Sequence, residues 1–173
     1  MNRDNLEKLK KVPLFKGVKE ATLEKLASSA VKKKFKADEI IIREGDWGDE
    51  MFILTKGTVK ITKYITLRKS EEDSADMEKD LITLNADDNP YFGEMALLER
   101  EERTATVTAL TDVELMCITA RKFDEIAKED YESAYKIVLH IAKTLSSRLR
   151  KTNKDVVKLT TVLGIALSRS GRS

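Results

Sequence analysis

Cysteine and histidine are almost absent from this sequence of 173 residues, which contains one of each, Cys117 and His140. A single cysteine forms no internal disulfide, which leaves the cytoplasm as the expected location. No cysteine or histidine stands at ligand spacing from His140, so we predict no metal site and no cofactor. His140 itself is expected on the surface of a helix.

Long hydrophobic runs and a nucleophile motif are also missing. No segment approaches the roughly 18 consecutive apolar residues of a membrane-spanning helix. The first residues, Met1-Asn2-Arg3-Asp4, are followed by no apolar stretch, so we expect no signal peptide and no membrane partner. The Gly-x-Ser-x-Gly pattern of a nucleophile elbow does not occur. These absences favour a protein that is not an enzyme.

The charges nearly balance over the whole chain, with a formal net charge of +2, but they are unevenly distributed. Lysine and arginine outnumber aspartate and glutamate by eleven to four in residues 1–36 and by eight to one in residues 143–173. Residues 69–102 reverse this, with twelve acidic and three basic side chains. Such asymmetry is compatible with an anionic partner. We favour the more common explanation, in which solvated helix faces at both ends flank an acidic loop region.

The spacing of the apolar residues changes along the chain. Residues 4–30 have helical spacing that is interrupted at Pro13, since proline disfavours a helical residue before it. From Val31 to Ile118 the pattern is typical of about eight short strands with turns rich in glycine and aspartate. Residues 68–80, almost wholly charged or small, are expected to form an exposed hairpin loop. The predicted fold class is α+β, an antiparallel, jelly-roll-like β-roll flanked by N-terminal helices and a long C-terminal helix.

Residues 120–166 are predicted to be helical, with Thr119 as the N-cap. Apolar residues recur in this region at alternating spacings of four and three, with one threonine among them: Val138, Ala142, Leu145, Leu149, Thr152, Val156, Leu159, Leu163 and Ala166. This heptad repeat is typical of a coiled coil, and we expect a parallel homodimer. The alternative is that the stripe packs on the chain's own roll, as its N-terminal half is expected to do. We assign residues 1–132 to the roll with its N-terminal helices, residues 133–167 to the long helix and residues 168–173 to a disordered tail.

One short segment combines several groups that suit a small anionic ligand. It runs Phe92-Gly93-Glu94-Met95-Ala96-Leu97 and is followed by Arg103-Thr104-Ala105. The segment supplies a carboxylate, a glycine that allows close approach of the backbone, the start of a short helix and a guanidinium. These groups suit a ligand that carries both a hydroxyl and a phosphate. Glu94 and Arg103 pairing with each other is the structural alternative, which we consider less economical because a buried ion pair contributes little stability.

This arrangement resembles the cyclic-nucleotide-binding domains of catabolite-activator-type regulators, cyclic-nucleotide-dependent kinases and nucleotide-gated channels. The resemblance covers roughly residues 8–160. It rests on Val12-Pro13-Leu14-Phe15, on Glu44-Gly45-Asp46-x-Gly48-Asp49 with Gly57 nearby, and above all on residues 92–107, which match the phosphate-binding cassette of the family. The resemblance implies a β-roll flanked by helices, with the ligand inside the roll.

The resemblance also implies roles for the cassette residues. Glu94 would accept a hydrogen bond from the ribose 2′-hydroxyl, and Gly93 would allow the backbone to come close. The N–H groups of the short helix that begins with Met95, Ala96 and Leu97 would face the cyclic phosphate. Arg103 would bind the exocyclic phosphate oxygens. Thr104 would donate a hydrogen bond to the phosphate or to a guanine edge.

The identity of the base is the finer question. Catabolite-activator regulators read adenine with a Thr-Ser pair on their long helix, and the matching positions here are Thr152 and Asn153. The alternative for Thr152 is a polar residue that fixes the register of a coiled coil. Thr104 follows the arginine as in guanine-binding kinases, although adenine-binding relatives also carry Ser or Thr there. We favour cAMP as the ligand, with cGMP as the alternative.

The sequence allows three interpretations of function. The first is a cyclic-nucleotide sensor that transmits binding through its C-terminal helix to an unknown protein partner. The second is a roll that binds no nucleotide and serves as a dimerisation or docking module. The third is the sensor half of a truncated transcription regulator. The residues after Leu163 are too few for a winged helix-turn-helix, so we expect no binding of nucleic acid by this chain.

Overall fold

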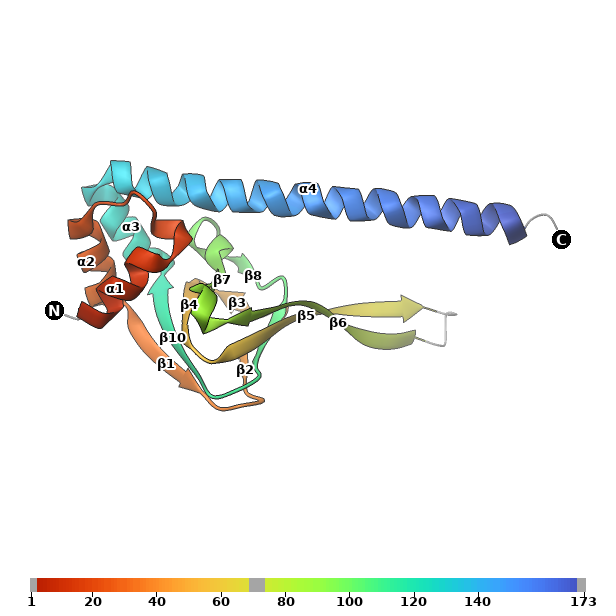
Figure 1. Cartoon of the computed structure of the whole chain (residues 1–173), viewed down its shortest axis with the longest axis horizontal. Coiled ribbons are helices and arrows are strands. Elements are labelled where there is room, and N and C mark those ends of the chain that lie inside the picture. Colours follow the sequence, from red (N-terminus) through yellow and green to blue (C-terminus); the bar gives the residue numbers. More distant parts are fainter. Residues whose placement is uncertain (1–2, 69–73, 171–173) are drawn as a thin grey trace.

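The protein consists of a β-roll with helices packed at one end and one long helix that extends past it (Figure 1). The computed structural model describes residues 3–68 and 74–170, and it describes side chains for all of these except residues 65–68, 74–78, 163 and 166–170. Within this part of the chain, no helix is long and apolar enough to cross a membrane.

The N-terminal segment folds into two short helices, α1 (Arg3–Lys11) and α2 (Glu20–Ser29), joined by the 3-10 turn η1 (Pro13–Phe15). Pro13 begins η1, and the residue before it, Val12, has an extended backbone, which confirms the predicted interruption. Leu9 and Leu14 are fully buried in a core that these helices share with the start of the long C-terminal helix. The N-terminal segment is therefore part of the domain.

The strands form two four-stranded antiparallel sheets and one small two-stranded sheet. The first sheet has the order β1 (Val31–Phe35), β10 (Val113–Thr119), β4 (Glu50–Lys56), β7 (Tyr91–Phe92). The second has the order β2 (Ile40–Ile42), β9 (Thr106–Ala109), β5 (Thr58–Arg68), β6 (Ser74–Asn85). The third pairs β3 (Trp47–Gly48) with β8 (Glu101–Glu102). The predicted antiparallel roll is confirmed.

The β5–β6 hairpin corrects the loop that was predicted over residues 68–80. The two strands pair from Thr58 with Asn85 out to Arg68 with Ser74, so residues 74–80 are strand despite their charge. Residues 69–73 lie outside the described part of the chain. The continuous backbone ladder of a long hairpin outweighs the low strand propensity of these residues.

Helix α3 (Ala120–Glu129) begins after Thr119, whose Oγ1 accepts a hydrogen bond from the Lys122 N–H at 3.2 Å and confirms the predicted cap. Helix α4 (Tyr131–Ser170) follows after a break at Asp130 and runs 40 residues. It ends at Ser170, so three residues of the predicted disordered tail are helical. His140 is half-buried instead of on the surface, because its Nδ1 lies 2.8 Å from the carbonyl oxygen of Leu14.

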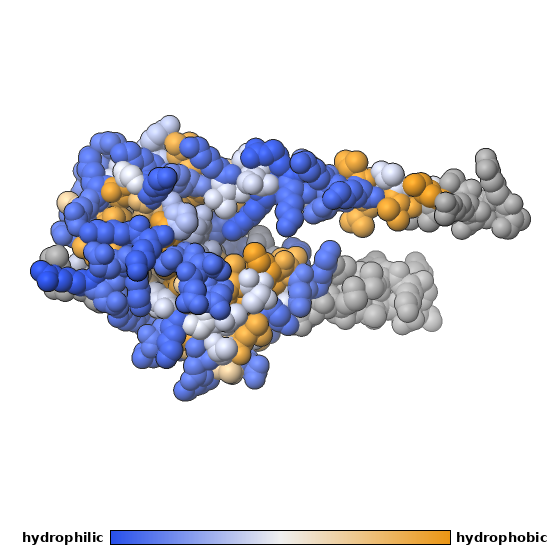
Figure 2. Space-filling view, viewed as in Figure 1, coloured by the Kyte–Doolittle hydropathy of each residue, from blue (hydrophilic) through white to orange (hydrophobic). Residues whose placement is uncertain are grey.

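The apolar stripe of α4 has two environments along its length. Ile137 and Ile141, which are not members of the predicted heptad, are fully buried in the core shared with the N-terminal helices, and Leu145 packs at the edge of that core. The heptad members before Leu145 do not pack on the roll as expected, because Val138 is 37% exposed and Ala142 is exposed. Beyond Leu145, Leu149 is 61% exposed and Leu159 is 66% exposed. Figure 2 shows apolar side chains gathered towards the far end of the coloured part of the helix, where Val156, Val157, Leu159, Val162 and Ile165 are exposed. The predicted heptad members Leu163 and Ala166 have side chains outside the described set.

Candidate functional site

The predicted cassette is a strand followed by a tight turn and a short helix. Phe92 ends β7 and stacks on Phe52 with ring centroids 5.4 Å apart. Gly93 has φ 71°, a left-handed conformation that favours glycine, and it leads into the 3-10 helix η3 (Glu94–Leu97). Within this short helix Ala96 and Leu97 are buried, whereas Met95 is 47% exposed. The apolar side chains therefore anchor the cassette to the roll.

Glu94 is the one cassette carboxylate that is almost completely buried, with 2% of its surface exposed. Its Oε1 accepts a hydrogen bond from Nη1 of Arg148 at 2.6 Å. Arg148 comes from α4, and its side chain is 57% exposed. A buried carboxylate is stable only when it is paired, and Arg148 is the partner of Glu94.

Arg148 was not among the site residues predicted from the sequence. The residue lies 54 positions after Glu94 and one helical turn before Thr152 on the same helix. The alternative pairing of Glu94 with Arg103 does not occur, because Glu94 bonds Arg148 and Arg103 turns to a backbone carbonyl.

A second polar contact joins the cassette to α4. The hydroxyl groups of Tyr91, in β7, and Thr144, in α4, lie 3.1 Å apart and share a hydrogen bond. Thr144 is one turn before Arg148, so both residues lie on the same side of the helix. Strand β7 and helix η3 thus each form a polar contact with α4.

Arg103 lies between β8 and β9. Its Nη2 donates a hydrogen bond to the carbonyl oxygen of Glu50 at 2.8 Å, and its guanidinium lies 5.8 Å from the centroid of the Phe52 ring. Burial lowers the pKa of Arg103, while the negative charges of Glu50 and Asp49 oppose that shift. The side chain also lines a cavity of about 340 Å³ together with Trp47.

Two glycines make room for Arg103. A Cβ atom at Gly48 would lie 2.2 Å from its Nε, and a Cβ atom at Gly93 would lie 3.0 Å from its Nη1. Both glycines belong to motifs that the sequence singled out, Gly48 at the end of β3 and Gly93 in the cassette. Their small size therefore allows the guanidinium to reach the cassette.

The remaining predicted site residues are exposed or half-buried. Thr104 is exposed, and its carbonyl oxygen accepts a hydrogen bond from Nζ of Lys63 at 3.2 Å. Ala105 is half-buried just before β9. Thr152 and Asn153 are exposed on the free part of α4, and no hydrogen bond joins them to the cassette among the described residues. The structure thus brings Gly93, Glu94 and Arg103 together, with Arg148 added.

Metal chemistry finds no support in the geometry. Within residues 3–68 and 74–170, no group of three or more His, Cys, Asp or Glu side chains is placed to hold a metal ion. Cys117 is buried in the roll, and its burial raises the pKa of its thiol to about 12, so the reactive thiolate is disfavoured.

Comparisons with known proteins show the family to which the chain belongs. Residues 32–130 match the family model for the cyclic nucleotide-binding domain. The chain is 33% identical over 131 residues to cGMP-dependent protein kinase, isozyme 1, of Drosophila melanogaster, a match that covers 71% of the chain and 16% of the kinase. It is 32% identical over 138 residues to the cAMP-activated global transcriptional regulator Vfr of Pseudomonas aeruginosa, which covers 78% of the chain and 58% of the regulator.

The fold is shared with a solved catabolite activator protein from Thermus thermophilus. The TM-score is 0.70 at 23% sequence identity, over 86% of this chain and 63% of that one. The chain thus spans less than two thirds of the length of each of these three proteins. The matched family model covers the roll and the cassette, and the chain belongs to the cyclic nucleotide-binding domain family.

Proposed function

We propose that this chain is a regulatory sensor that binds a cyclic nucleotide without altering it, with cAMP favoured over cGMP. The observation that carries the proposal is the buried carboxylate of Glu94, held 2.6 Å from a guanidinium of α4 and next to a glycine in left-handed conformation. A structural ion pair contributes little when one partner must be buried, so a ligand-binding role explains the arrangement better.

In this proposal the ligand bridges the cassette and Arg103. Glu94 accepts the ribose 2′-hydroxyl, in a charged hydrogen bond that is stronger than a neutral one. The N–H of Met95 lies at the start of η3, a position that favours the cyclic phosphate, whereas the N–H of Ala96 donates to the carbonyl oxygen of Gly93 at 3.1 Å. Arg103 exchanges the Glu50 carbonyl for the exocyclic phosphate oxygens, and its planar fork suits that geometry.

In this proposal, ligand binding affects α4 through the contact between Glu94 and Arg148. A ribose hydroxyl that donates to the Glu94 carboxylate changes the hydrogen bonding that now fastens the cassette to α4. The ligand shifts the position of the helix only to the extent that it binds one arrangement of this contact more tightly than the other. We propose that α4 is the output element and that an unknown protein partner reads its position.

We further propose that α4 pairs with the α4 of a second copy. Leu149, Val156 and Leu159 follow the heptad and are 61%, 51% and 66% exposed, which leaves a long apolar stripe uncovered in one chain. A parallel coiled coil would cover this stripe. Thr152 and Asn153 lie within the same stretch, and in a dimer they would supply the base contacts, adenine being favoured.

One observation favours a second candidate function. Arg148 already supplies a hydrogen bond and a positive charge to the buried carboxylate of Glu94 from within the chain. A roll of this kind would also serve as a docking module, or as the sensor half of a longer transcription regulator. The distinction between the two candidates rests on whether the roll binds nucleotide at all.

Calorimetric titration of the protein with cAMP and with cGMP tests the proposal. We expect tighter binding of cAMP, and Arg103→Leu should weaken it by about 2–5 kcal/mol, or roughly 30- to 3,000-fold. Arg121→Leu is the matched control, because Arg121 is exposed on α3 and pairs only with Glu125 within the described residues. Equal titration curves for Arg103→Leu and the unmodified protein would refute the assignment of the phosphate contact.

Binding of neither nucleotide at millimolar concentration would favour the docking module. A thermal-shift measurement gives the same distinction, because a ligand at 100 times its Kd stabilises the folded protein by about 2.7 kcal/mol.

A further inference from the structure

An ion pair lies in the same cavity as Arg103. Nζ of Lys33, in β1, is 2.6 Å from Oε2 of Glu50, in β4. Strand β10 separates β1 from β4 in the first sheet, so the lysine side chain reaches across a strand to its partner. Both residues are half-buried, and both line the cavity of about 340 Å³ together with Arg103. The pair therefore belongs to the surroundings of the proposed phosphate contact.

Glu50 contacts two cations through two different groups. Its carboxylate bonds Lys33, whereas its backbone carbonyl accepts the hydrogen bond from Arg103 at 2.8 Å. Both cations also lie near the ring of Phe52, at 5.7 Å and 5.8 Å from its centroid. Among the residues that the structure describes, no ion pair joins the Glu50 carboxylate to Arg103, although its negative charge opposes the lowering of the Arg103 pKa by burial. The carboxylate is thus close to Arg103 but is held by Lys33.

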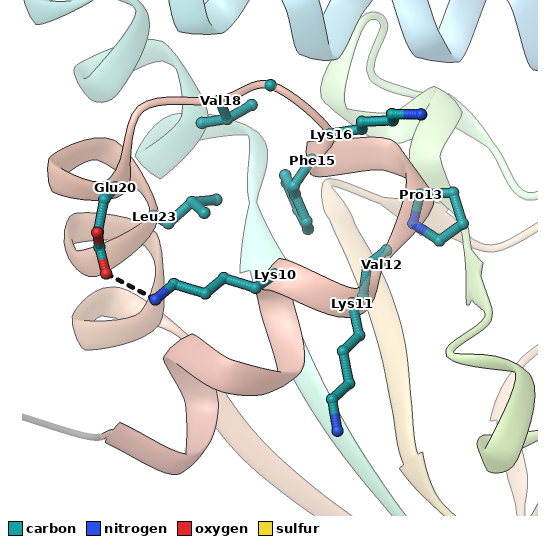
Figure 3. Close-up of a pocket in the computed structure, with 10 residues that line it drawn as sticks. Lys10, Lys11, Val12, Pro13, Phe15, Lys16, Val18, Glu20 and Leu23 are labelled. Carbon is teal, nitrogen blue, oxygen red and sulfur yellow. Dashed lines mark hydrogen bonds and ion pairs between the residues drawn. The ribbon is translucent and has the colours of Figure 1, made fainter.

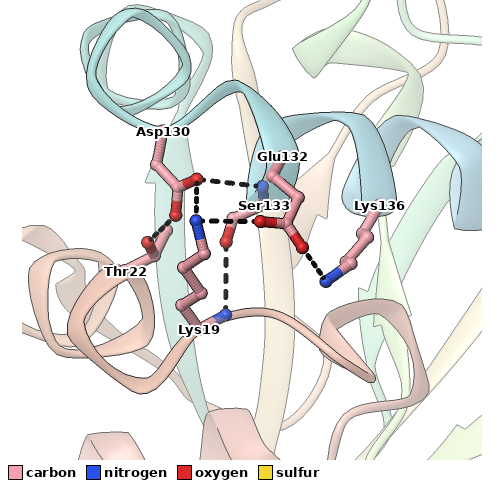
Figure 4. A network of polar contacts seen from close by, with 6 residues as sticks. All are labelled: Lys19, Thr22, Asp130, Glu132, Ser133 and Lys136. Carbon is pink, nitrogen blue, oxygen red and sulfur yellow. Dashed lines mark hydrogen bonds and ion pairs between the residues drawn. The ribbon is translucent and has the colours of Figure 1, made fainter.

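Two other lysine pairs of this chain connect helices. Nζ of Lys10 lies 2.6 Å from Glu20 and joins α1 to α2 (Figure 3). Nζ of Lys19 lies 3.1 Å from Asp130 and joins the segment before α2 to the break before α4 (Figure 4). The pair of Lys33 differs from these, because the cation beside it belongs to the proposed nucleotide site.

Arg103 can bind a phosphate only while no other anion occupies its guanidinium. A carboxylate would occupy it strongly, because the planar fork of arginine forms two parallel hydrogen bonds to a carboxylate as it does to a phosphate. Lys33 prevents this competition by holding the carboxylate of Glu50. Without Lys33 the carboxylate would be half-buried and unpaired, which favours a new contact with Arg103.

We propose that Lys33 is a positioning residue of the nucleotide site, which holds the Glu50 carboxylate away from Arg103 and so leaves the guanidinium available for the phosphate. This inference rests on the proposed function, in which Arg103 binds the phosphate. Lys33 itself does not contact the ligand in this arrangement. If Lys33 bound the phosphate directly, removal of the Glu50 carboxylate would not compensate for its loss.

Calorimetric titration with cAMP measures the effect. Lys33→Met keeps much of the side-chain length without its charge, and it should weaken cAMP binding about three- to tenfold, because half-buried charges interact less strongly than fully buried ones. Lys33→Met/Glu50→Gln should restore the affinity to within about twofold of the unmodified protein, because a neutral amide does not compete with the phosphate. Unchanged affinity in Lys33→Met would overturn the proposal. Weakened binding without recovery in the double variant would overturn it too, in favour of a direct phosphate contact.

The matched control is Lys34→Met, alone and together with Glu114→Gln. Lys34 is the next residue of β1 and lies 3.0 Å from Glu114, but it is exposed and does not line the cavity beside Arg103. Both control variants should bind cAMP as the unmodified protein does. Equal weakening in Lys34→Met and Lys33→Met would overturn the proposal, because a general loss of positive charge would then explain both results.

Urea denaturation without nucleotide, at one fixed protein concentration, tests the pairing of Arg103 independently. If Lys33→Met allows Glu50 to pair with Arg103, then Arg103→Leu should lower the urea midpoint more in the Lys33→Met background than in the unmodified protein. An equal shift in both backgrounds would overturn the inference. Absence of cAMP and cGMP binding in every protein would instead refute the proposed function, while the urea midpoints still decide whether Lys33 controls the pairing of Arg103.

Discussion

The contact between Glu94 and Arg148 gives a prediction whose magnitude follows from the burial of the two side chains. Arg148→Met removes the guanidinium and keeps much of the side-chain length, which leaves the carboxylate of Glu94, 2% exposed, without its partner. Removing one member of a fully buried pair costs about 3–5 kcal/mol. Because the side chain of Arg148 is 57% exposed, solvent screens the pair, and we expect a loss of about 1–3 kcal/mol in the free energy of unfolding.

Urea denaturation and thermal unfolding at one fixed protein concentration measure this loss, which corresponds to a decrease in Tm of roughly 2–12 °C. A double-mutant cycle with Glu94→Gln isolates the coupling between the two side chains, for which we expect about 1–2 kcal/mol. We also expect saturating cAMP to stabilise Arg148→Met more than the unmodified protein, because in this variant the ribose hydroxyl would become the hydrogen-bond partner of Glu94. A coupling below about 0.5 kcal/mol would refute the reasoning, since distant pairs already differ from additivity by that amount.

Three further predictions concern the turn before the cassette helix, the free part of α4 and the α3–α4 break. Gly93→Ala should destabilise the protein by about 1–2 kcal/mol, through its φ of 71°, and should weaken nucleotide titration because its Cβ meets Arg103. Leu149→Glu/Leu159→Glu should convert the proposed dimer to a monomer in sedimentation experiments, and an unchanged mass would contradict the coiled coil. Hydrogen bonds from Ser133 and Thr22, together with Lys19, hold the pKa of Asp130 well below its ordinary value. The stabilisation from a lowered folded-state pKa is complete above the unfolded-state pKa of about 3.9 and is lost as the pH falls from there toward the folded-state pKa. In Asp130→Asn the free energy of unfolding should therefore depend less on pH below about pH 4. Identical profiles of stability against pH for the two proteins would contradict this role.

Much of the fold was predictable because its signals are local. Pro13 interrupts the N-terminal helices and Thr119 caps α3, and each effect depends on neighbouring residues alone. The short apolar runs between Val31 and Ile118 marked the strands, although burial does not alternate in β4 and β10, where residues 51–54 and 115–118 are all buried. These patterns were sufficient for the fold class, whereas the family was predicted above all from the resemblance of residues 92–107 to the phosphate-binding cassette.

The features that the sequence did not predict depend on contacts between distant segments. The strand over residues 74–80 forms because β5 offers a continuous backbone partner, which composition does not reveal. Arg148 was not predicted because its partner Glu94 lies 54 residues earlier and only the docking of α4 brings them together. The half-buried position of His140 has the same origin, since its ring faces the distant carbonyl of Leu14.

The break at Asp130 has a mechanical consequence for α4. The helix has 40 residues, so at a rise of about 1.5 Å per residue it is about 60 Å long. A rotation of only about 5° at its first turn would carry its far end through about 5 Å, roughly the height of one helical turn. Lys19 contacts Asp130 and Glu132 at the start of this helix, so a rearrangement there would act over almost its whole length. The contacts of Tyr91 and Glu94 lie farther along the helix, at Thr144 and Arg148, and a rearrangement there would move only the part beyond them.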